Sequence, residues 1–311
     1  MKHSHTLVLG TRGSALALWQ ARHVGALLRT AGISVQIVEV RTTGDRITDV
    51  PLAKIGDKGL FTRELDVALL KGEIDLAVHS LKDLPTRLPD GITLAAVSER
   101  EEPWDAFVAH PSFIGHLDDL PEGATIATSS LRRQAQLLAW RPDLEVVPVR
   151  GNVDTRLRKL DESAWHGMIL AAAGLRRLNM DSRIRQVVPA SIMLPAVGQG
   201  ALGIVCAQEN EELRQQLHDA LDDTDTRVAV TSERAFLRRL EGGCQVPIGA
   251  YASVQSGRLS VEGMVASLDG RMLVRDRIGG NPENAASLGN ELAERLLKKG
   301  AADILRDIRS K

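Results

Sequence analysis

The stretch TLVLGTRGSALALWQA (6–21) contains a short apolar run, a turn of Thr, Arg, Gly and Ser, and a segment with helical spacing of apolar residues. A second stretch, TIATSSLRRQAQLLAW (125–140), has the same order. A short apolar run bounded by turn residues favours a buried strand, and a 3.6-residue spacing favours a helix. The two stretches predict two similarly built lobes, although strand-to-helix turns of this kind also arise independently.

Other apolar runs extend this pattern over the first 220 residues. They predict strands at 35–40, 74–80, 92–97, 146–150, 167–172 and 201–206. Helical spacing appears between them, as in FTRELDVALLKG (61–72). Strands that alternate with helices are typical of α/β domains with largely parallel sheets.

Two charged stretches interrupt the alternation, SEREEPWD (98–105) and DALDDTDT (219–226). A helix-like segment follows the second stretch, and apolar runs come near 248–254, 259–266 and 272–278. A further helical pattern, PENAASLGNELAERLLKKG, begins at residue 282. Strands followed by a helix predict a small α+β domain at the C-terminus.

Composition excludes several classes of protein. The 311 residues suffice for two or three domains. The 39 Lys and Arg residues balance 40 Asp and Glu residues, which disfavours a general nucleic-acid binder. No apolar run approaches the ~20 residues that span a membrane. Two cysteines form neither a disulfide framework nor a metal cluster, so we expect a cytoplasmic protein without a metal.

Arginines follow four of the predicted strands. They are Arg12, the pair Arg132 and Arg133, the pair Arg150 and Arg156, and the pair Arg176 and Arg177. Ligands of α/β sheets bind at the carboxyl ends of strands, and helix N-termini there attract anions. The pattern indicates a polyanionic ligand. The alternative is that Ser130 and Asn152 only cap helices while the arginines face solvent.

Two further stretches carry candidate functional groups. In AVHSLKDLP (77–85), an apolar strand leads directly to Lys82 and Asp83. Asp83 is a candidate acid/base or cation-stabilising group, or alternatively the cap of the next segment. In KIGDKGLFTREL (54–65), two glycines surround Lys58, which suggests a lid or a phosphate-binding loop without the Walker A spacing.

The two cysteines have different surroundings. Cys206 lies in an apolar run and is predicted to be inert core. Cys244 lies in EGGCQVPIG (241–249), between glycines that permit close approach and a proline. A thiol in such a turn could be a nucleophile, a redox site, a covalent anchor or a purely structural residue.

Eight motifs occur in the order of one known family and cover nearly the whole chain. They are TRGSALALWQA, PLAKIGDKGLFTREL, DLAVHSLKDLP, EREEPWDAF, ATSSLRRQAQL, RGNVDTRLRKL, LPAVGQGALGI and ERAFLRRLEGGCQVPIGAY. Together they resemble the hydroxymethylbilane synthases, also called porphobilinogen deaminases. The resemblance implies a cytoplasmic transferase of porphyrin and haem biosynthesis. It would condense four porphobilinogen molecules head to tail, with loss of ammonia, into hydroxymethylbilane.

The resemblance also implies a cofactor and a catalytic group. A dipyrromethane would be attached through a thioether to Cys244, which makes that cysteine an anchor rather than a nucleophile. Asp83 would be the catalytic carboxylate. Porphobilinogen and its oligopyrrole intermediates carry two carboxylates per ring, so a six-ring chain would carry twelve and would need clustered cations.

The family's other site residues are carried over motif by motif. The cofactor-binding set would be Ser80, Lys82, Asp83, Thr128, Ser129, Ser130, Arg132, Arg133, Arg150 and Cys244. The substrate-binding set would be Arg12, Ser14, Lys54, Lys58, Arg150, Arg156, Arg177 and Gln199.

The fold implied is two lobes like those of type II periplasmic binding proteins, with the active site between them, plus a small C-terminal α+β domain. Residues 1–100 with 200–218 would form the first lobe, 101–199 the second, and 219–311 the domain that bears the cysteine. A monomer without nucleic-acid or membrane partners is expected. Two alternatives stay open: a two-lobed anion-binding protein without catalysis, and a regulator with an effector-binding domain of the same kind.

Overall fold

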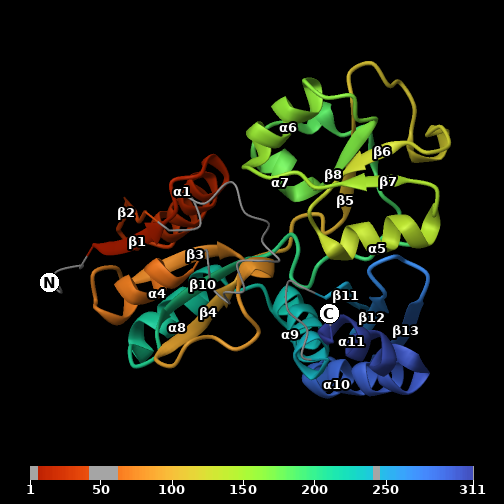
Figure 1. Ribbon diagram of the computed structural model, residues 1–311. Coiled ribbons are helices and arrows are strands. Elements are labelled where there is room, and N and C mark those ends of the chain that lie inside the picture. The colour runs from red at the N-terminus through yellow and green to blue at the C-terminus, as the bar shows by residue number, and fades with distance from the viewer. Residues whose placement is uncertain (1–5, 42–61, 241–245, 311) are drawn as a thin grey trace, which may run out of the picture. The chain divides into compact units, whose positions relative to one another are not determined.

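The computed structural model describes residues 6–41, 62–240 and 246–310 (Figure 1). The chain forms two compact units. Unit 1 comprises Met1–Glu101 and Ala201–Arg227, and unit 2 comprises Glu102–Gly200 and Val228–Lys311. The chain therefore passes between the units three times, after residues 101, 200 and 227.

Unit 1 is built on a five-stranded sheet with the order β2-β1-β3-β10-β4. Its strands are β1 (Leu7–Thr11), β2 (Val35–Glu39), β3 (Leu76–Ser80), β4 (Ile92–Val97) and β10 (Leu202–Ala207). Its helices are α1 (Ala15–Thr30), α4 (Arg63–Leu70) and α8 (Glu211–Leu221). β1 runs parallel to β2 and β3, whereas β10 is antiparallel to both of its neighbours.

The two faces of this sheet pack against different helices. Leu9 and the other core residues on its face pack against Val24 of α1 and Leu217 of α8. The next residue, Gly10, points to the opposite face because side chains alternate along a strand. A Cβ atom there would collide with Ile74 and Leu65, so glycine permits α4 to approach the sheet closely.

Unit 2 contains a second five-stranded sheet, with the order β7-β6-β8-β5-β9. Its strands are β5 (Asp105–Ala109), β6 (Thr125–Ala127), β7 (Glu145–Val147), β8 (Gly167–Ala171) and β9 (Gln186–Val187). Its helices are α5 (Leu131–Trp140), α6 (Val153–Asp161) and α7 (Ala172–Arg177). One face packs against Leu137 of α5, and the other against Leu160 of α6 and Leu175 of α7.

The two sheets repeat one strand pattern, which confirms the predicted pair of similarly built α/β lobes. Four of the five strands in each sheet run in the same direction, which agrees with the expectation of largely parallel sheets, and one strand runs the opposite way. The antiparallel strand is β10 in one sheet and β5 in the other. Each is the first strand that the chain forms after passing from the other unit, so it enters its sheet from the end opposite to its neighbours.

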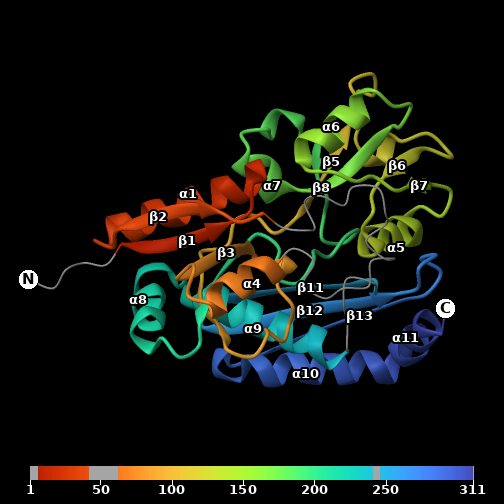
Figure 2. The same ribbon diagram turned by 60° about the vertical axis from the view of Figure 1, so that its left-hand side comes forward.

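The C-terminal part of unit 2 is the predicted small α+β structure. It consists of α9 (Thr224–Arg239), β11 (Ile248–Gln255), β12 (Arg258–Ala266), β13 (Leu273–Gly280), α10 (Ala285–Leu296) and α11 (Ala302–Arg309). The three strands form an antiparallel sheet, and Figure 2 shows α10 along one of its faces. Phe236 of α9 and Leu292 of α10 lie in the core beneath this sheet.

Short helical turns complete the described chain. They are Leu81–Asp83, Leu117–Asp119, Asp181–Arg183, Pro282–Asn284 and a π-helical turn at Leu297–Ala301. The predicted break at 219–226 is mostly helical, because only Asp222 and Asp223 separate α8 from α9. The strand β5 was not predicted, since its first residue closes the charged stretch 98–105.

Within unit 2, the C-terminal sheet packs against the second lobe. Gly270, with φ of +70°, lies against the backbone of α5 so closely that any Cβ atom would collide with it. Ala135 of α5 shares a small apolar cluster with Met264 of β12. The division into three domains with the boundaries given above stays a prediction.

Candidate active site

Four predicted site residues gather at one edge of the first sheet. β1 and β3 are parallel neighbours, so their carboxyl ends meet at the same edge. Arg12 follows β1, and Ser80 ends β3. The turn of 3₁₀ helix after β3 contains Lys82 and Asp83, and it is held by a hydrogen bond from Leu81 N to Ala201 O.

Hydroxyl groups fix the local backbone at this edge. Ser14 is the N-cap of α1, and its side chain accepts a hydrogen bond from Ala17 N. Gln20 of α1 donates to the hydroxyl of Ser80 at 2.8 Å. Asp83 is exposed, and none of the described residues donates a hydrogen bond to its carboxylate. The carboxylate is therefore accessible to a ligand.

His79 does not add positive charge to this edge. It is 5% exposed and follows the apolar part of β3. Burial, reinforced by the charge of Arg12, lowers the pKa of His79 from 6.5 to about 4. The imidazole is therefore neutral near pH 7, and among the described residues the cations here are Arg12 and Lys82.

The second sheet has an equivalent edge. β6 is parallel to both β7 and β8, so the carboxyl ends of these three strands also lie together. The stretch Thr128–Ser130 follows β6, Arg150 comes shortly after β7, and α7 with Arg177 follows β8. β5 begins at this edge because it is antiparallel to β8, with Asp105 paired to Ala171.

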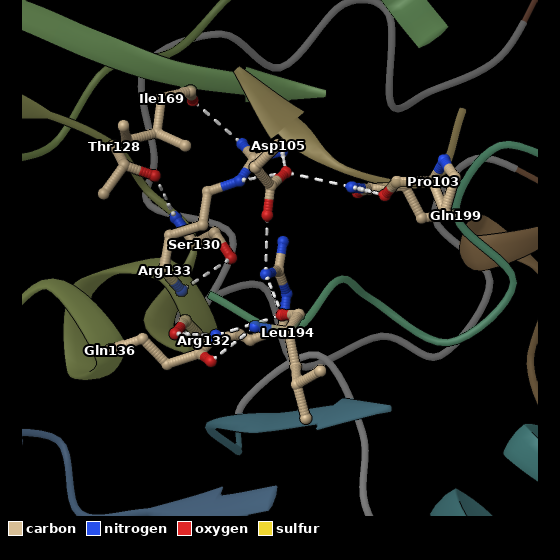
Figure 3. Close-up of polar contacts among 10 residues, drawn as sticks. All are labelled: Pro103, Asp105, Thr128, Ser130, Arg132, Arg133, Gln136, Ile169, Leu194 and Gln199. Carbon is tan, nitrogen blue, oxygen red and sulfur yellow. Dashed lines mark hydrogen bonds and ion pairs between the residues drawn. The ribbon is translucent and has the colours of Figure 1, made fainter. Parts of the chain in front are cut away.

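A buried ion cluster occupies this edge (Figure 3). The carboxylate of Asp105 accepts from Arg132 Nη1 at 2.7 Å, and from Arg133 Nη2 at 2.7 Å and Nε at 3.0 Å. Arg132 Nη1 also donates to Leu194 O at 2.6 Å, and Arg133 Nη1 donates to Ile169 O at 3.0 Å. Both arginines are 6% exposed and Asp105 is 0% exposed. Arg132 and Arg133, two of the three arginines predicted to bind the cofactor, are thus held firmly in place.

The charges of this cluster are mutually dependent. Burial by itself would raise the pKa of Asp105, yet the two guanidinium groups hold it well below its usual range. Burial likewise lowers the pKa of Arg132, which the charge of Asp105 opposes. Two guanidinium groups and one carboxylate leave an excess positive charge in a site shielded from water.

The hydroxyls between β6 and α5 shape the turn itself. Ser130 caps α5 by accepting from Arg133 N at 3.5 Å, and Thr128 Oγ1 accepts from Ser130 N at 3.2 Å. The hydroxyl of Ser129 donates to Val149 O at 2.8 Å and accepts from Val149 N at 2.9 Å. Ser130 therefore caps a helix, as the alternative interpretation of the sequence held, and Ser129 joins the turn after β6 to the one after β7.

Arg150 differs from the paired arginines. Its Nη1 atom is shielded from solvent and has no hydrogen-bond partner among the described residues. Gly151 follows with φ of +116°, and its carbonyl oxygen accepts from Arg156 Nε at 2.7 Å. Asn152 occupies the N-cap position of α6 without a side-chain hydrogen bond to the helix. A buried donor without an acceptor is costly, so Arg150 is suited to an anionic ligand.

Arg177 contacts the segment that leads from unit 2 to unit 1, and Gln199 lies in that segment and contacts residues near the start of unit 2. Arg177 Nη2 donates to Gly200 O at 2.5 Å. Gln199 Nε2 donates to Pro103 O at 2.7 Å and to Asp105 Oδ1 at 3.0 Å. The sequence interpretation assigned both residues to substrate binding but did not single out Asp105. The sequence feature that could have identified Asp105 is an acidic residue directly before the apolar run AFVA.

Three predicted site residues, Lys54, Lys58 and Cys244, lie outside the described residues. Cys206 is buried in the core of unit 1, as predicted. Residues 6–41, 62–240 and 246–310 contain no group of three or more acidic, His or Cys residues that could hold a metal ion. In the same ranges, no helix combines the length and apolarity needed to cross a membrane.

Two family models match the chain. Residues 7–215 match the porphobilinogen deaminase, dipyromethane cofactor binding domain, and residues 228–298 match the porphobilinogen deaminase C-terminal domain. The chain belongs to the porphobilinogen deaminase family. The resemblance in the eight motifs is thereby confirmed.

Curated relatives of this family match over almost the full length. The porphobilinogen deaminase of Desulforudis audaxviator is 55% identical and covers 98% of both chains. That of Pelotomaculum thermopropionicum is 52% identical and covers 97% of both. Among solved structures, the methionine-binding protein MetQ matches 69% of this chain and 89% of its own, at 15% identity and a TM-score of 0.44.

Proposed function

We propose that this chain builds a linear tetrapyrrole on a dipyrromethane cofactor that is covalently attached to Cys244. As a porphobilinogen deaminase, it is a transferase that condenses four porphobilinogen molecules head to tail and releases ammonia at each step. The observation that carries the proposal is the match of the two family models to residues 7–215 and 228–298. The arginines at the carboxyl ends of the strands support it, because cofactor and substrate are polycarboxylates.

The residues at the edge of the second sheet fit the cofactor. The excess positive charge of the Asp105 cluster favours the binding of carboxylates, and so does the unsatisfied Nη1 of Arg150. Arg132, Arg133 and Arg150 would bind them, with hydrogen bonds from Thr128, Ser129 and Ser130 nearby. When bound, the cofactor supplies the pyrrole carbon from which the product chain grows.

Asp83 would act on the reacting pyrroles. Loss of ammonia from porphobilinogen leaves an azafulvenium cation, which a nearby carboxylate stabilises electrostatically. The same carboxylate can hold the pyrrole N–H and move protons during ammonia loss and final deprotonation. The exposure of Asp83 supports this role, and the adjacent Lys82 and Ser80 would bind the cofactor.

The remaining predicted residues would bind substrate carboxylates. They are Arg12, Ser14, Arg156, Arg177 and Gln199, together with Lys54 and Lys58. Gln199 and Arg177 already donate to backbone carbonyls, so they would act at least partly by holding the segment before residue 201. The chain would function as a cytoplasmic monomer without nucleic-acid or membrane partners, in the three-domain arrangement predicted from the sequence.

The proposed function is tested by incubating the purified full-length chain with porphobilinogen. We expect porphobilinogen to be consumed and ammonia released, with one linear tetrapyrrole formed from four molecules, which oxidation converts to a coloured porphyrin. A protein that only binds anions would retain porphobilinogen reversibly without consuming it. That outcome would favour the non-catalytic alternative.

Arg150→Gln is expected to raise the KM for porphobilinogen or to lower cofactor occupancy about 10- to 100-fold, because a charge-assisted hydrogen bond contributes about 1.5–3 kcal/mol. The melting temperature of the variant should not fall, since Nη1 of Arg150 has no partner among the described residues. Steady-state kinetics, intact mass and thermal unfolding measure these effects.

A matched control for this substitution is Arg158→Gln. Arg158 is exposed on α6 and pairs only with Glu162 one turn later, among the described residues. It should leave both KM and cofactor occupancy unchanged. Unchanged KM and occupancy in Arg150→Gln itself would contradict its role in binding carboxylates.

A further inference from the structure

We propose that Asp105 is a positioning residue whose carboxylate holds Arg132 and Arg133 in place to receive carboxylates of the dipyrromethane. This inference rests on the proposed function, because it concerns the same cofactor. It assigns a role to a residue that would not itself contact the cofactor.

The position of Asp105 follows from strand direction. β5 is antiparallel to β8, so its first residue is brought to the edge where the parallel strands of the sheet end. Arg132 and Arg133 begin α5, which follows β6 at the same edge. A single carboxylate can therefore reach both guanidinium groups, although it is 27 and 28 residues away from them in sequence.

The contacts orient each guanidinium group by two different acceptors. Asp105 and Leu194 O hold Arg132, whereas Asp105 and Ile169 O hold Arg133. An arginine side chain has many rotamers, and ordering it only when a ligand binds would weaken binding. Here each guanidinium group is ordered by acceptors that belong to the protein itself.

The contacts also leave donors for a ligand. Nη1 of Arg132 makes both of its hydrogen bonds within the protein, whereas Nε and Nη2 have no acceptor among the described residues. Among the residues that the structure describes, Asp105 is the only carboxylate that pairs with either arginine. One carboxylate balances one of the two charges, so the second remains for an anion.

Gln199 fixes the orientation of Asp105. Its amide nitrogen donates to Asp105 Oδ1 and to Pro103 O, and its side chain is buried, with 1% of the residue exposed. Because the amide is neutral, it orients the carboxylate without neutralising the negative charge that pairs with the two arginines. Gln199 and Pro103 lie within two residues of the points where the chain passes between the units, so the cluster is anchored to both of these segments.

The test compares how fast full-length variants acquire the cofactor. Protein without attached cofactor is separated from each preparation and incubated with porphobilinogen. The temperature is one at which circular dichroism shows the protein to be folded. Intact mass spectrometry then measures how fast the mass of two linked pyrroles is gained. Asp105→Asn should acquire this mass at least about 10-fold more slowly than the wild type. Asp105→Glu, which keeps the charge, should be slowed less.

Asp222→Asn is the matched control. The side chain of Asp222 is only 3% exposed, accepts from Arg227 Nε at 2.8 Å and from Val97 N at 2.7 Å, and belongs to unit 1. We expect it to lower thermal stability, as we also expect of Asp105→Asn, yet to acquire the cofactor at the wild-type rate. A merely structural role for Asp105 would make the two variants behave alike.

The outcomes separate this inference from the proposed function. If the wild type and Asp222→Asn gain no pyrrole mass, the proposed function is wrong. If they gain it and Asp105→Asn gains it equally fast, only the role of Asp105 is overturned. Should Asp105→Asn not fold at any temperature, Gln199→Met decides, because it removes the orienting hydrogen bonds but keeps all three charges; a wild-type rate in that variant would overturn the proposal.

Discussion

Replacing Asp83 by asparagine is expected to lower the rate of tetrapyrrole synthesis by more than ~10³-fold. General acid–base help is typically worth about 10²–10⁴-fold, and electrostatic stabilisation of a developing charge contributes in addition. Asparagine has nearly the size of aspartate but can neither offset the azafulvenium charge nor carry a proton. The exposed carboxylate accepts no hydrogen bond from the described residues, so its loss should barely change stability.

The measurement is kcat with porphobilinogen, together with the intact mass of the variant. The mass shows whether the cofactor is present, so that a lost rate is not confused with lost loading. Asp90→Asn is a matched control, because Asp90 is also an exposed carboxylate in a turn of unit 1. It should retain wild-type turnover. Near-normal turnover in a fully loaded Asp83→Asn protein would remove Asp83 from the mechanism.

Cys244→Ala is expected to abolish both covalent cofactor and product formation. Alanine cannot form a thioether, so the purified variant should lack the added mass of two linked pyrroles that we expect the wild type to carry. It should also fail to gain that mass on incubation with porphobilinogen. Intact mass spectrometry before and after the incubation, followed by a product assay, measures both effects.

Cys206→Ala is the control for this experiment. Cys206 is the other cysteine of the chain, and it is fully buried in the core of unit 1. Removing its sulfur should lower stability moderately through the lost packing, while the cofactor stays attached. If Cys244→Ala kept the added mass and Cys206→Ala lost it, the attachment point would have been assigned to the wrong cysteine.

Local patterns in the sequence were sufficient to find most elements. Strands such as β1, β4 and β8 lie within a residue or two of the apolar runs that predicted them. The C-terminal order of strands and helix was also predicted. These features depend on short apolar runs, turn residues and helical spacing, all of which are properties of neighbouring residues.

The sequence also showed which turns contain arginines. It only partly showed which of these turns lie at the same edge of a sheet. Arg132, Arg150 and Arg177 each come after one of the strands β6, β7 and β8, which are parallel and adjacent. The sequence indicated that each arginine follows a strand. It did not indicate that a strand from earlier in the chain, β5, would run the opposite way beside β8.

The sequence by itself therefore determined the family, the α/β character of the lobes and the candidate residues for binding a polycarboxylate. Only the tertiary structure decided which of those residues are already paired. Arg132 and Arg133 share Asp105, whereas Nη1 of Arg150 has no partner among the described residues. The reason is physical: the pairing of a buried charge depends on strand direction and register, which bring together side chains far apart in the sequence.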